Sequence, residues 1–146
     1  MFRGRSTHAL DDKGRIIIPA RFRDVLKAQY DDRLVITNLR LCLVAYPFEE
    51  WRSIEDKAAS LSDIDEHVKA FLRLIISGAI ECPVDRQGRV LVPPSLREYA
   101  RLEKEIVLVG MLKHFEIWDK SLWDEEMQRS RDNYTQISAY MAQTGL

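Results

Sequence analysis

The sequence predicts an α+β fold, mostly β with helices, in which two copies of one small unit pair about a pseudo-twofold axis into a small β-barrel. A motif of Asp-x-x-Gly-Arg, three branched aliphatic residues and proline occurs at 11–19 and again at 85–93. Two apolar segments follow each motif at similar distances, within 33–47 and 106–118. One copy is too small to bury its own sheet, so the repeat itself indicates paired copies. Closing the barrel would also remove exposed strand edges.

Each copy is predicted to run strand, turn, strand, short helix, strand, strand. In the first copy these elements are expected at residues 6–10, 11–14, 15–19, 19–29, 33–38 and 41–47. Asp11 and Gly14 favour a tight turn, because Asp opens turns and Gly accepts a positive φ. The apolar residues before Pro19 are typical of a strand, and the proline suits the first position of a helix.

The repeats are predicted at 5–52 and 79–124, separated by a helical insert at 53–78 and followed by a C-terminal helical tail at 125–146. Apolar residues at helical spacing indicate the insert. Ser62 with Asp65, and Ser121 with Asp124, have the spacing of capping boxes and predict two helix starts.

Composition indicates a soluble intracellular protein. Hydrophobic residues make up 46% of the chain and charged residues 31%, and no apolar run reaches the roughly 20 residues that a bilayer requires. The two isolated cysteines, Cys42 and Cys82, favour a reducing compartment without a disulfide.

An enzyme is the class with the least support. The three histidines lie far apart without metal-binding spacing, and no glycine-rich phosphate loop or nucleophile signature is present. We therefore expect no cofactor, no metal site, no catalytic residue and no small-molecule substrate.

Charge alternates in sign along the chain although the net charge is only −1. Residues 1–27 contain seven Lys or Arg and three Asp or Glu, a net +4, whereas residues 49–66 contain two and seven, a net −5. Residues 85–104 contain five and three, a net +2. Basic segments centred on the repeated motif suit a surface that faces a polyanion, although a mixed solvated surface gives the same pattern.

The arginine after each turn glycine is the main candidate for binding. An arginine at the base of a loop can hold a phosphate or read guanine O6 and N7 with its guanidinium fork. The alternative is an Asp–Arg pair that only holds the hairpin together. The candidate DNA-binding residues are Arg15, Lys13, Arg3, Arg5, Arg89 and Arg86, and the candidate turn residues are Asp11, Gly14, Asp85 and Gly88.

The segments MFRGRSTHALDDKGRIIIPARFR and DRQGRVLVPPSLR resemble the MraZ family, and the resemblance extends to about residue 125. It implies two AbrB/SpoVT-type swapped-hairpin domains, each marked by D-x-x-x-R. It further implies a cytoplasmic, nucleoid-associated bacterial regulator that binds double-stranded DNA sequence-specifically. The implied targets are the cell-division and cell-wall gene cluster and the regulator's own operon, and the implied assembly is a homo-oligomeric ring on tandem direct repeats.

Two further expectations concern the relative DNA binding of the two turns and the function of the tail. The first turn, flanked by Arg3, Arg5 and Lys13, is expected to be the stronger DNA reader, because the second has Arg86-Gln87 in place of Asp12-Lys13. The alternative function is an antitoxin, whose DNA-binding domain carries a tail that binds a protein partner.

Overall fold

The computed structural model describes all 146 residues and confirms an α+β fold in which the elements of two copies follow in the same order. The first copy contains β1 (Arg5–Ala9), β2 (Arg15–Ile17), α1 (Ala20–Gln29), β3 (Arg33–Asn38) and β4 (Leu43–Pro47). The second contains β5 (Ile80–Pro83), β6 (Arg89–Leu91), α4 (Pro94–Tyr99), β7 (Glu105–Gly110) and β8 (Phe115–Asp119). The predicted order of strands, turn and short helix is confirmed in both copies.

The two copies exchange their first strands. β1 pairs antiparallel with β7 of the second copy, and β5 pairs antiparallel with β3 of the first. β4 pairs with β8 at the centre, and β2 pairs with β6. Exchanging the copies maps this pattern onto itself, so the strand pairing has the predicted pseudo-twofold symmetry.

The predicted closed barrel is not found. The strands form one six-stranded sheet, in the order β1-β7-β8-β4-β3-β5, and a separate two-stranded sheet of β2 and β6. β2 and β6 have three residues each and pair with one another, and beyond them Ile18 N donates to Gly88 O and Val92 N to Gly14 O. β2 and β6 pair only with one another and form no ladder with the edge strands β1 and β5, so the strands do not close into a barrel.

A single core joins the copies. Its eighteen buried residues come from both halves of the chain and include Ile16 and Val90 of the short strands. The rings of Phe2, Phe22 and Phe115 pack at centroid distances of 5.0 to 5.4 Å, so an aromatic cluster bridges the first and second copies.

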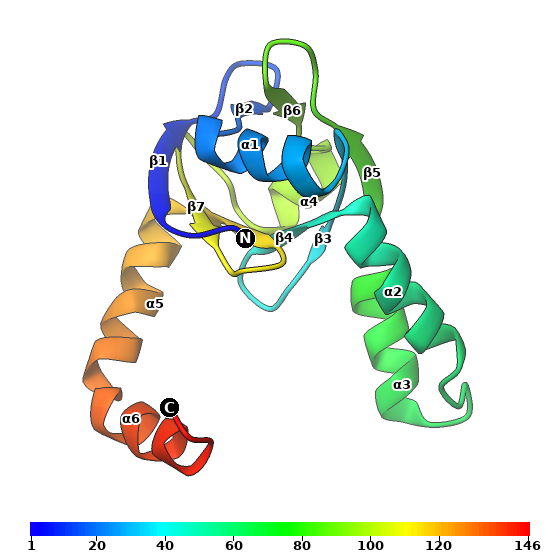
Figure 1. The fold of residues 1–146 in the computed structure, drawn as a ribbon, viewed down its shortest axis with the longest axis vertical. Coiled ribbons are helices and arrows are strands. Elements are labelled where there is room, and N and C mark those ends of the chain that lie inside the picture. The colour runs from blue at the N-terminus through cyan, green and yellow to red at the C-terminus, as the bar shows by residue number, and fades with distance from the viewer.

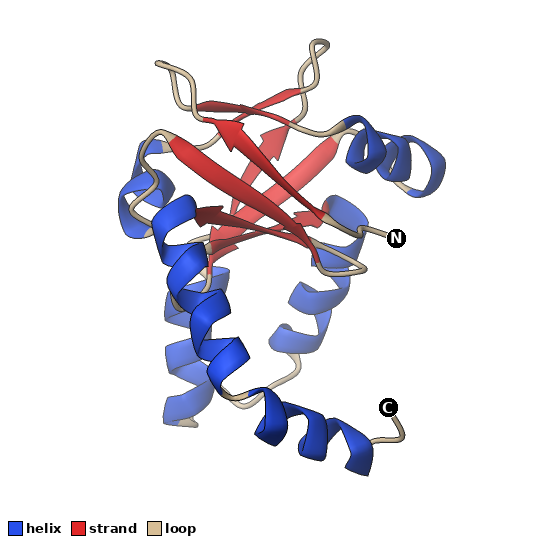
Figure 2. Cartoon of the chain, turned by 90° about the vertical axis from the view of Figure 1, so that its left-hand side faces the viewer, coloured by secondary structure: helices blue, strands red, loops and turns tan.

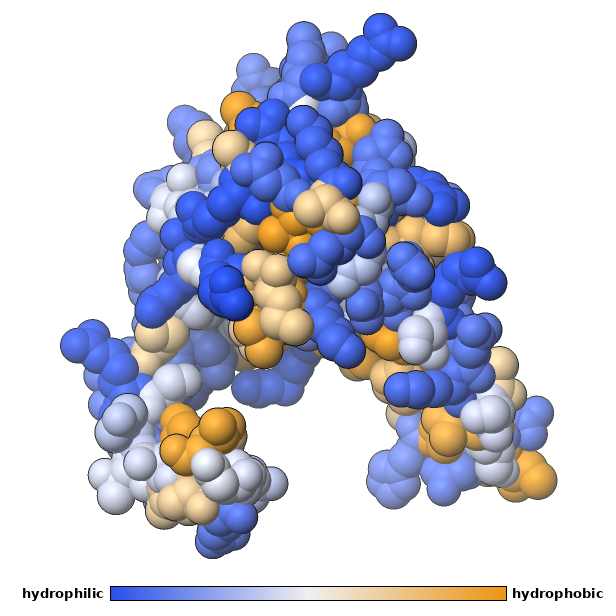
Figure 3. Space-filling model, in the orientation of Figure 1, coloured by the Kyte–Doolittle hydropathy of each residue, from blue (hydrophilic) through white to orange (hydrophobic).

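Two helical legs project from the sheets (Figure 1). One leg is the insert, with α2 (Phe48–Ala59), α3 (Glu66–Phe71) and the π-helical turn η1 (Leu72–Ile76), and the other is the tail, with α5 (Lys120–Asp132) and α6 (Tyr134–Gln143). Equivalent aromatic pairs attach the legs, Tyr46 with Trp51 at 5.7 Å and Trp118 with Trp123 at 5.6 Å between ring centroids. Hydrophobic groups remain exposed near the lower end of each leg (Figure 3).

The helix starts differ from the prediction. Asp65, not Ser62, caps α3 by accepting from the backbone N–H groups of His67 and Val68. Asp119, not Ser121, caps α5. In both cases the aspartate that directly precedes the helix holds the free amides, which leaves the predicted serine without that role. The C-terminal helical tail consists of two helices, α5 and α6.

None of the helices combines the length and apolar character needed to span a bilayer.

The shared core predicts that both copies unfold together. Replacing Phe115 by Ala should remove about 3–5 kcal/mol of unfolding free energy, because its fully buried ring contacts both Phe2 and Phe22 of the other copy. Urea unfolding followed by circular dichroism and by tryptophan fluorescence should give one shared transition at a lower midpoint. Ile64→Ala, on a side chain that is 82% exposed, should leave the midpoint unchanged. Two separate transitions would contradict the shared core.

Candidate nucleic-acid interface

The first turn is held by the side chain of its own aspartate. Asp11 Oδ1 accepts from the backbone N–H groups of Lys13 and Arg15 at 2.9 and 2.8 Å, and Gly14 N donates to Asp11 O at 2.9 Å. Gly14 has a φ of +84°, a region in which a side chain would be strained. The Asp11 side chain and the positive φ of Gly14 therefore shape the backbone of the turn.

The second turn repeats this geometry. Asp85 Oδ1 accepts from the backbone N–H groups of Gln87 and Arg89, both at 2.9 Å, and Gly88 has a φ of +76°. Each aspartate also accepts from the arginine side chain, at 2.7 Å for Arg15 Nε to Asp11 Oδ2 and 3.0 Å for Arg89 Nε to Asp85 Oδ2.

These hydrogen bonds keep the turn carboxylates ionised. The backbone N–H groups of Arg15 and Arg89 are the main reason that the pKa values of Asp11 and Asp85 lie below the usual value for Asp, and the guanidinium groups lower them further. Both carboxylates are consequently ionised at neutral pH. An exposed Asp–Arg pair of this kind contributes little to folding stability, so its main effect is to orient the guanidinium group.

The orientation leaves the binding end of each arginine free. Only Nε of Arg15 and of Arg89 bonds to the aspartate, and neither arginine donates from its terminal amino groups within the chain. The side chains are 27% and 28% exposed, so both are partly enclosed but reachable. Two terminal amino groups held in this way can donate to a phosphate or to two acceptors on one base edge.

Each turn packs against a helix of the other copy. A Cβ added at Gly14 would lie 2.5 Å from the Arg97 guanidinium carbon, and one added at Gly88 would lie 2.6 Å from a terminal nitrogen of Arg23. Arg23 and Arg97 were not among the predicted site residues. The sequence carried a signal for them, since they occupy matching positions of the two copies.

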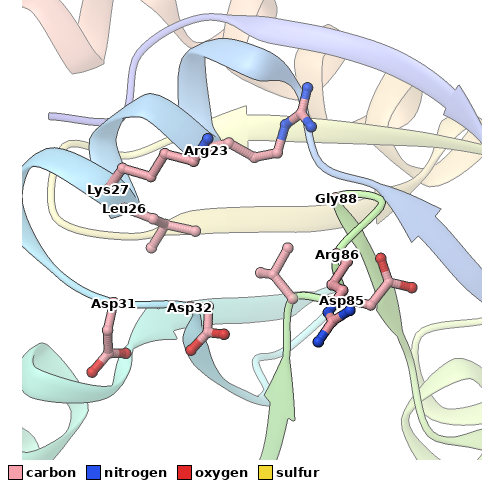
Figure 4. Close-up of a pocket in the computed structure, with 9 residues that line it drawn as sticks. Arg23, Leu26, Lys27, Asp31, Asp32, Asp85, Arg86 and Gly88 are labelled. Atoms are coloured by element: carbon pink, nitrogen blue, oxygen red, sulfur yellow. The ribbon is translucent and has the colours of Figure 1, made fainter.

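A cleft of about 300 Å³ lies beside the second turn (Figure 4). Three cationic residues, Arg23, Lys27 and Arg86, and three acidic residues, Asp31, Asp32 and Asp85, line it. Because the charges balance, this cleft does not favour an anion over a cation.

The structure brings four of the six predicted DNA-binding residues to one end of the molecule. Both turns, with Lys13, Arg15, Arg86 and Arg89, lie opposite the helical legs (Figures 1 and 2).

Arg3 lies two residues before β1, and Arg5 is the first residue of β1. Both therefore lie at the end of the strand away from the turn. Arg5 pairs with Val109, and its guanidinium lies 5.7 Å from the ring centroid of Trp123 on α5. The backbone oxygen of Arg3 accepts from Arg21 Nε at 3.2 Å. The extended strand separates both residues from Arg15, because each strand residue adds about 3.3 Å.

The family model and the curated relatives that match this chain all carry the same family name. The model of a family described as "MraZ protein, putative antitoxin-like" matches twice, at residues 1–74 and 75–144. The chain is 51% identical over 145 residues to a protein of Syntrophobacter fumaroxidans named transcriptional regulator MraZ, covering 99% of this chain and 97% of the relative. Proteins of the same name from Moorella thermoacetica and Pediococcus pentosaceus are 45% and 41% identical, over 97% and 100% of this chain and 96% and 100% of the relatives. The chain belongs to the MraZ family.

Proposed function

We propose that this chain is a transcriptional regulator that binds double-stranded DNA sequence-specifically through its two Asp–Arg turns. The observation that carries the proposal is the pair of aspartate-oriented arginines, each with free terminal amino groups, at one end of the molecule. Guanine offers O6 and N7 in the major groove as two acceptors for one such arginine, and phosphates accept in the same way.

The two turns should contribute comparably. Residues 11–15 contain two acidic and two basic residues, whereas residues 85–89 contain one and two, so the first turn carries no charge advantage of its own. The basic residues expected to favour it, Arg3 and Arg5, lie at the other end of β1. The matched Asp–Arg geometry therefore supports similar roles for Arg15 and Arg89.

Family membership supports a more specific role. Relatives are named as transcriptional regulators, and we propose that this chain acts in the cytoplasm at the nucleoid. Its targets would be the cell-division and cell-wall gene cluster, including its own operon.

We further propose a ring-shaped homo-oligomer in which the helical legs contact neighbouring subunits. No residue of α6 is buried within the chain, and Tyr134, Ile137 and Tyr140 are exposed on it. Neighbouring subunits in such a ring would present their turns to one duplex at tandem direct repeats, because head-to-tail contacts relate subunits by rotation without local dyads.

The same exposed helix favours the second candidate function, an antitoxin. In that case α6 would bind a protein partner while the turns bind DNA. A toxin gene beside the gene for this chain would support the antitoxin, and neighbouring cell-wall genes would support the regulator.

The first test separates DNA reading from hairpin stability. We expect Arg15→Ala and Arg89→Ala each to weaken binding to DNA from upstream of the chain's own gene by at least about tenfold. Their melting temperatures should stay near that of the unmodified protein, since the turn amides bond to Asp11 and Asp85 and not to the arginine side chains. Titration by fluorescence anisotropy measures the affinity.

Arg129→Ala is the matched control. Arg129 also forms a 2.7 Å ion pair with an acidic side chain, Glu126, but lies on the α5 leg. On a duplex that holds a single repeat, where no neighbouring subunit is needed, this variant should bind like the unmodified protein. If the Arg15 and Arg89 variants bind normally, the turns are not the reader, and if they melt far below the unmodified protein, the arginines serve the hairpin.

The second test concerns assembly on DNA. Repeats contacted from one face of a duplex recur at about one helical turn, roughly 10 base pairs. Inserting about five base pairs between two footprinted repeats should therefore sharply reduce affinity, and inserting about ten should partly restore it. Equal affinity for all three spacings, or a monomer in light scattering at binding concentrations, would rule out the ring.

A further inference from the structure

The outer face of the β2–β6 sheet carries apolar side chains beside the two arginines. In the antiparallel register Arg15 lies opposite Leu91, and Ile17 lies opposite Arg89. Residues two apart on a strand share a face, so these four side chains lie on one side of the sheet. Ile16, paired with Val90, points to the core on the other side, where both residues are 1% exposed.

Ile17 and Leu91 are 56% and 53% exposed, so more than half of each residue's surface is open to solvent. Single exposed aliphatic residues are ordinary on protein surfaces. These two differ because they occupy matching places in the two copies, and each is the direct cross-strand neighbour of a turn arginine. Such neighbours have Cβ atoms about 4.5–5.5 Å apart. The face therefore presents two adjacent units, each consisting of one arginine and one aliphatic side chain.

The chemistry of this face matches the floor and walls of the major groove. That groove admits a two-stranded β-ribbon, and its base edges offer acceptors on guanine and one apolar group, the 5-methyl of thymine. We propose that Ile17 and Leu91 read thymine 5-methyl groups next to the bases or phosphates held by Arg89 and Arg15. This inference rests on the proposed DNA-binding function. It adds that the apolar residues select thymine.

Hydrogen bonding favours DNA over a second copy of the chain as the occupant. The free groups around Ile17 and Leu91 include the terminal amino groups of Arg15 and Arg89, which are donors only. Two copies of this face placed together would bring these donors near one another, and the neighbouring acceptors, the Asp11 and Asp85 carboxylates, already bond to the arginines. A duplex supplies acceptors for the arginines and methyl groups for the aliphatic side chains in one surface.

The test removes the methyl groups without changing base pairing. DNA from upstream of the chain's own gene is prepared with thymine or with uracil throughout, and binding is measured against an excess of scrambled thymine duplex. The unmodified protein should lose about fourfold in affinity for each methyl contact removed, the effect of one buried methylene group. The variant Ile17→Ser/Leu91→Ser should bind the thymine duplex more weakly and should bind both duplexes equally.

Leu112→Ser is the control, because Leu112 is equally exposed at 55% but follows β7, outside the ribbon. It should discriminate thymine from uracil like the unmodified protein. Tight, specific and equal binding of both duplexes by the unmodified protein would overturn the inference while leaving the proposed function intact. Loss of discrimination in Leu112→Ser, or its persistence in the double variant, would also overturn it.

Specificity for the upstream duplex and self-association of the protein are measured on the same samples. If the unmodified protein does not prefer the upstream duplex over the scrambled one, the proposed function itself fails. If light scattering shows that the double variant, with an unchanged melting temperature, has lost an oligomer that the unmodified protein forms, a second copy covers this face and the inference is wrong.

Discussion

The exchange of first strands between the two copies is the constraint on which the remaining structure depends. β1 has its partner in β7 and β5 has its partner in β3, so neither copy can complete its sheet alone. The loops that lead out of these exchanged strands become the two turns. Strand exchange consequently sets the distance and relative direction of Arg15 and Arg89, and the short β2–β6 pairing between them fixes the register.

This constraint couples the binding residues to the core. Ile16 and Val90 pack inside while their strand neighbours Arg15 and Arg89 face outward, so slipping the register by one residue would exchange buried and exposed sets. The helix arginines Arg23 and Arg97 lie against the turn glycines of the opposite copy. In the proposed DNA complex, guanidinium groups already oriented by Asp11 and Asp85 would lose less conformational entropy on binding.

Features set by neighbouring residues, such as the turns, were predictable from the sequence. Features set by a choice between alternative bonding partners, such as strand pairing and helix capping, were not. The turn at Asp11 and Gly14 follows from local backbone preferences, and the sequence located it. Barrel closure failed as a prediction because β2 and β6 are only three residues long, pair with each other, and form no ladder with the edge strands β1 and β5. The capping residue of α3 was misassigned because both Ser62 and Asp65 can accept from free amides, and the position of the first turn decided between them. Arg3 and Arg5 were grouped with Arg15 by sequence distance, although an extended strand carries them away from it.

A pseudo-twofold face must depart from exact symmetry if it is to bind direct repeats, as proposed, in one orientation. A face with perfect twofold symmetry would bind a repeat equally well in either direction, whereas direct repeats have a polarity. The chain breaks its symmetry at a few positions of this face: Asp12 corresponds to Arg86, Lys13 to Gln87, and Ile17 to Leu91. In the proposed complex, the matched Asp–Arg pairs would supply similar contacts in both halves of a site, and the unmatched residues would supply the energy difference between its two orientations. Two copies within one chain allow this division, because each copy can differ in its turn without a change in the other, which identical subunits of a symmetric dimer cannot do.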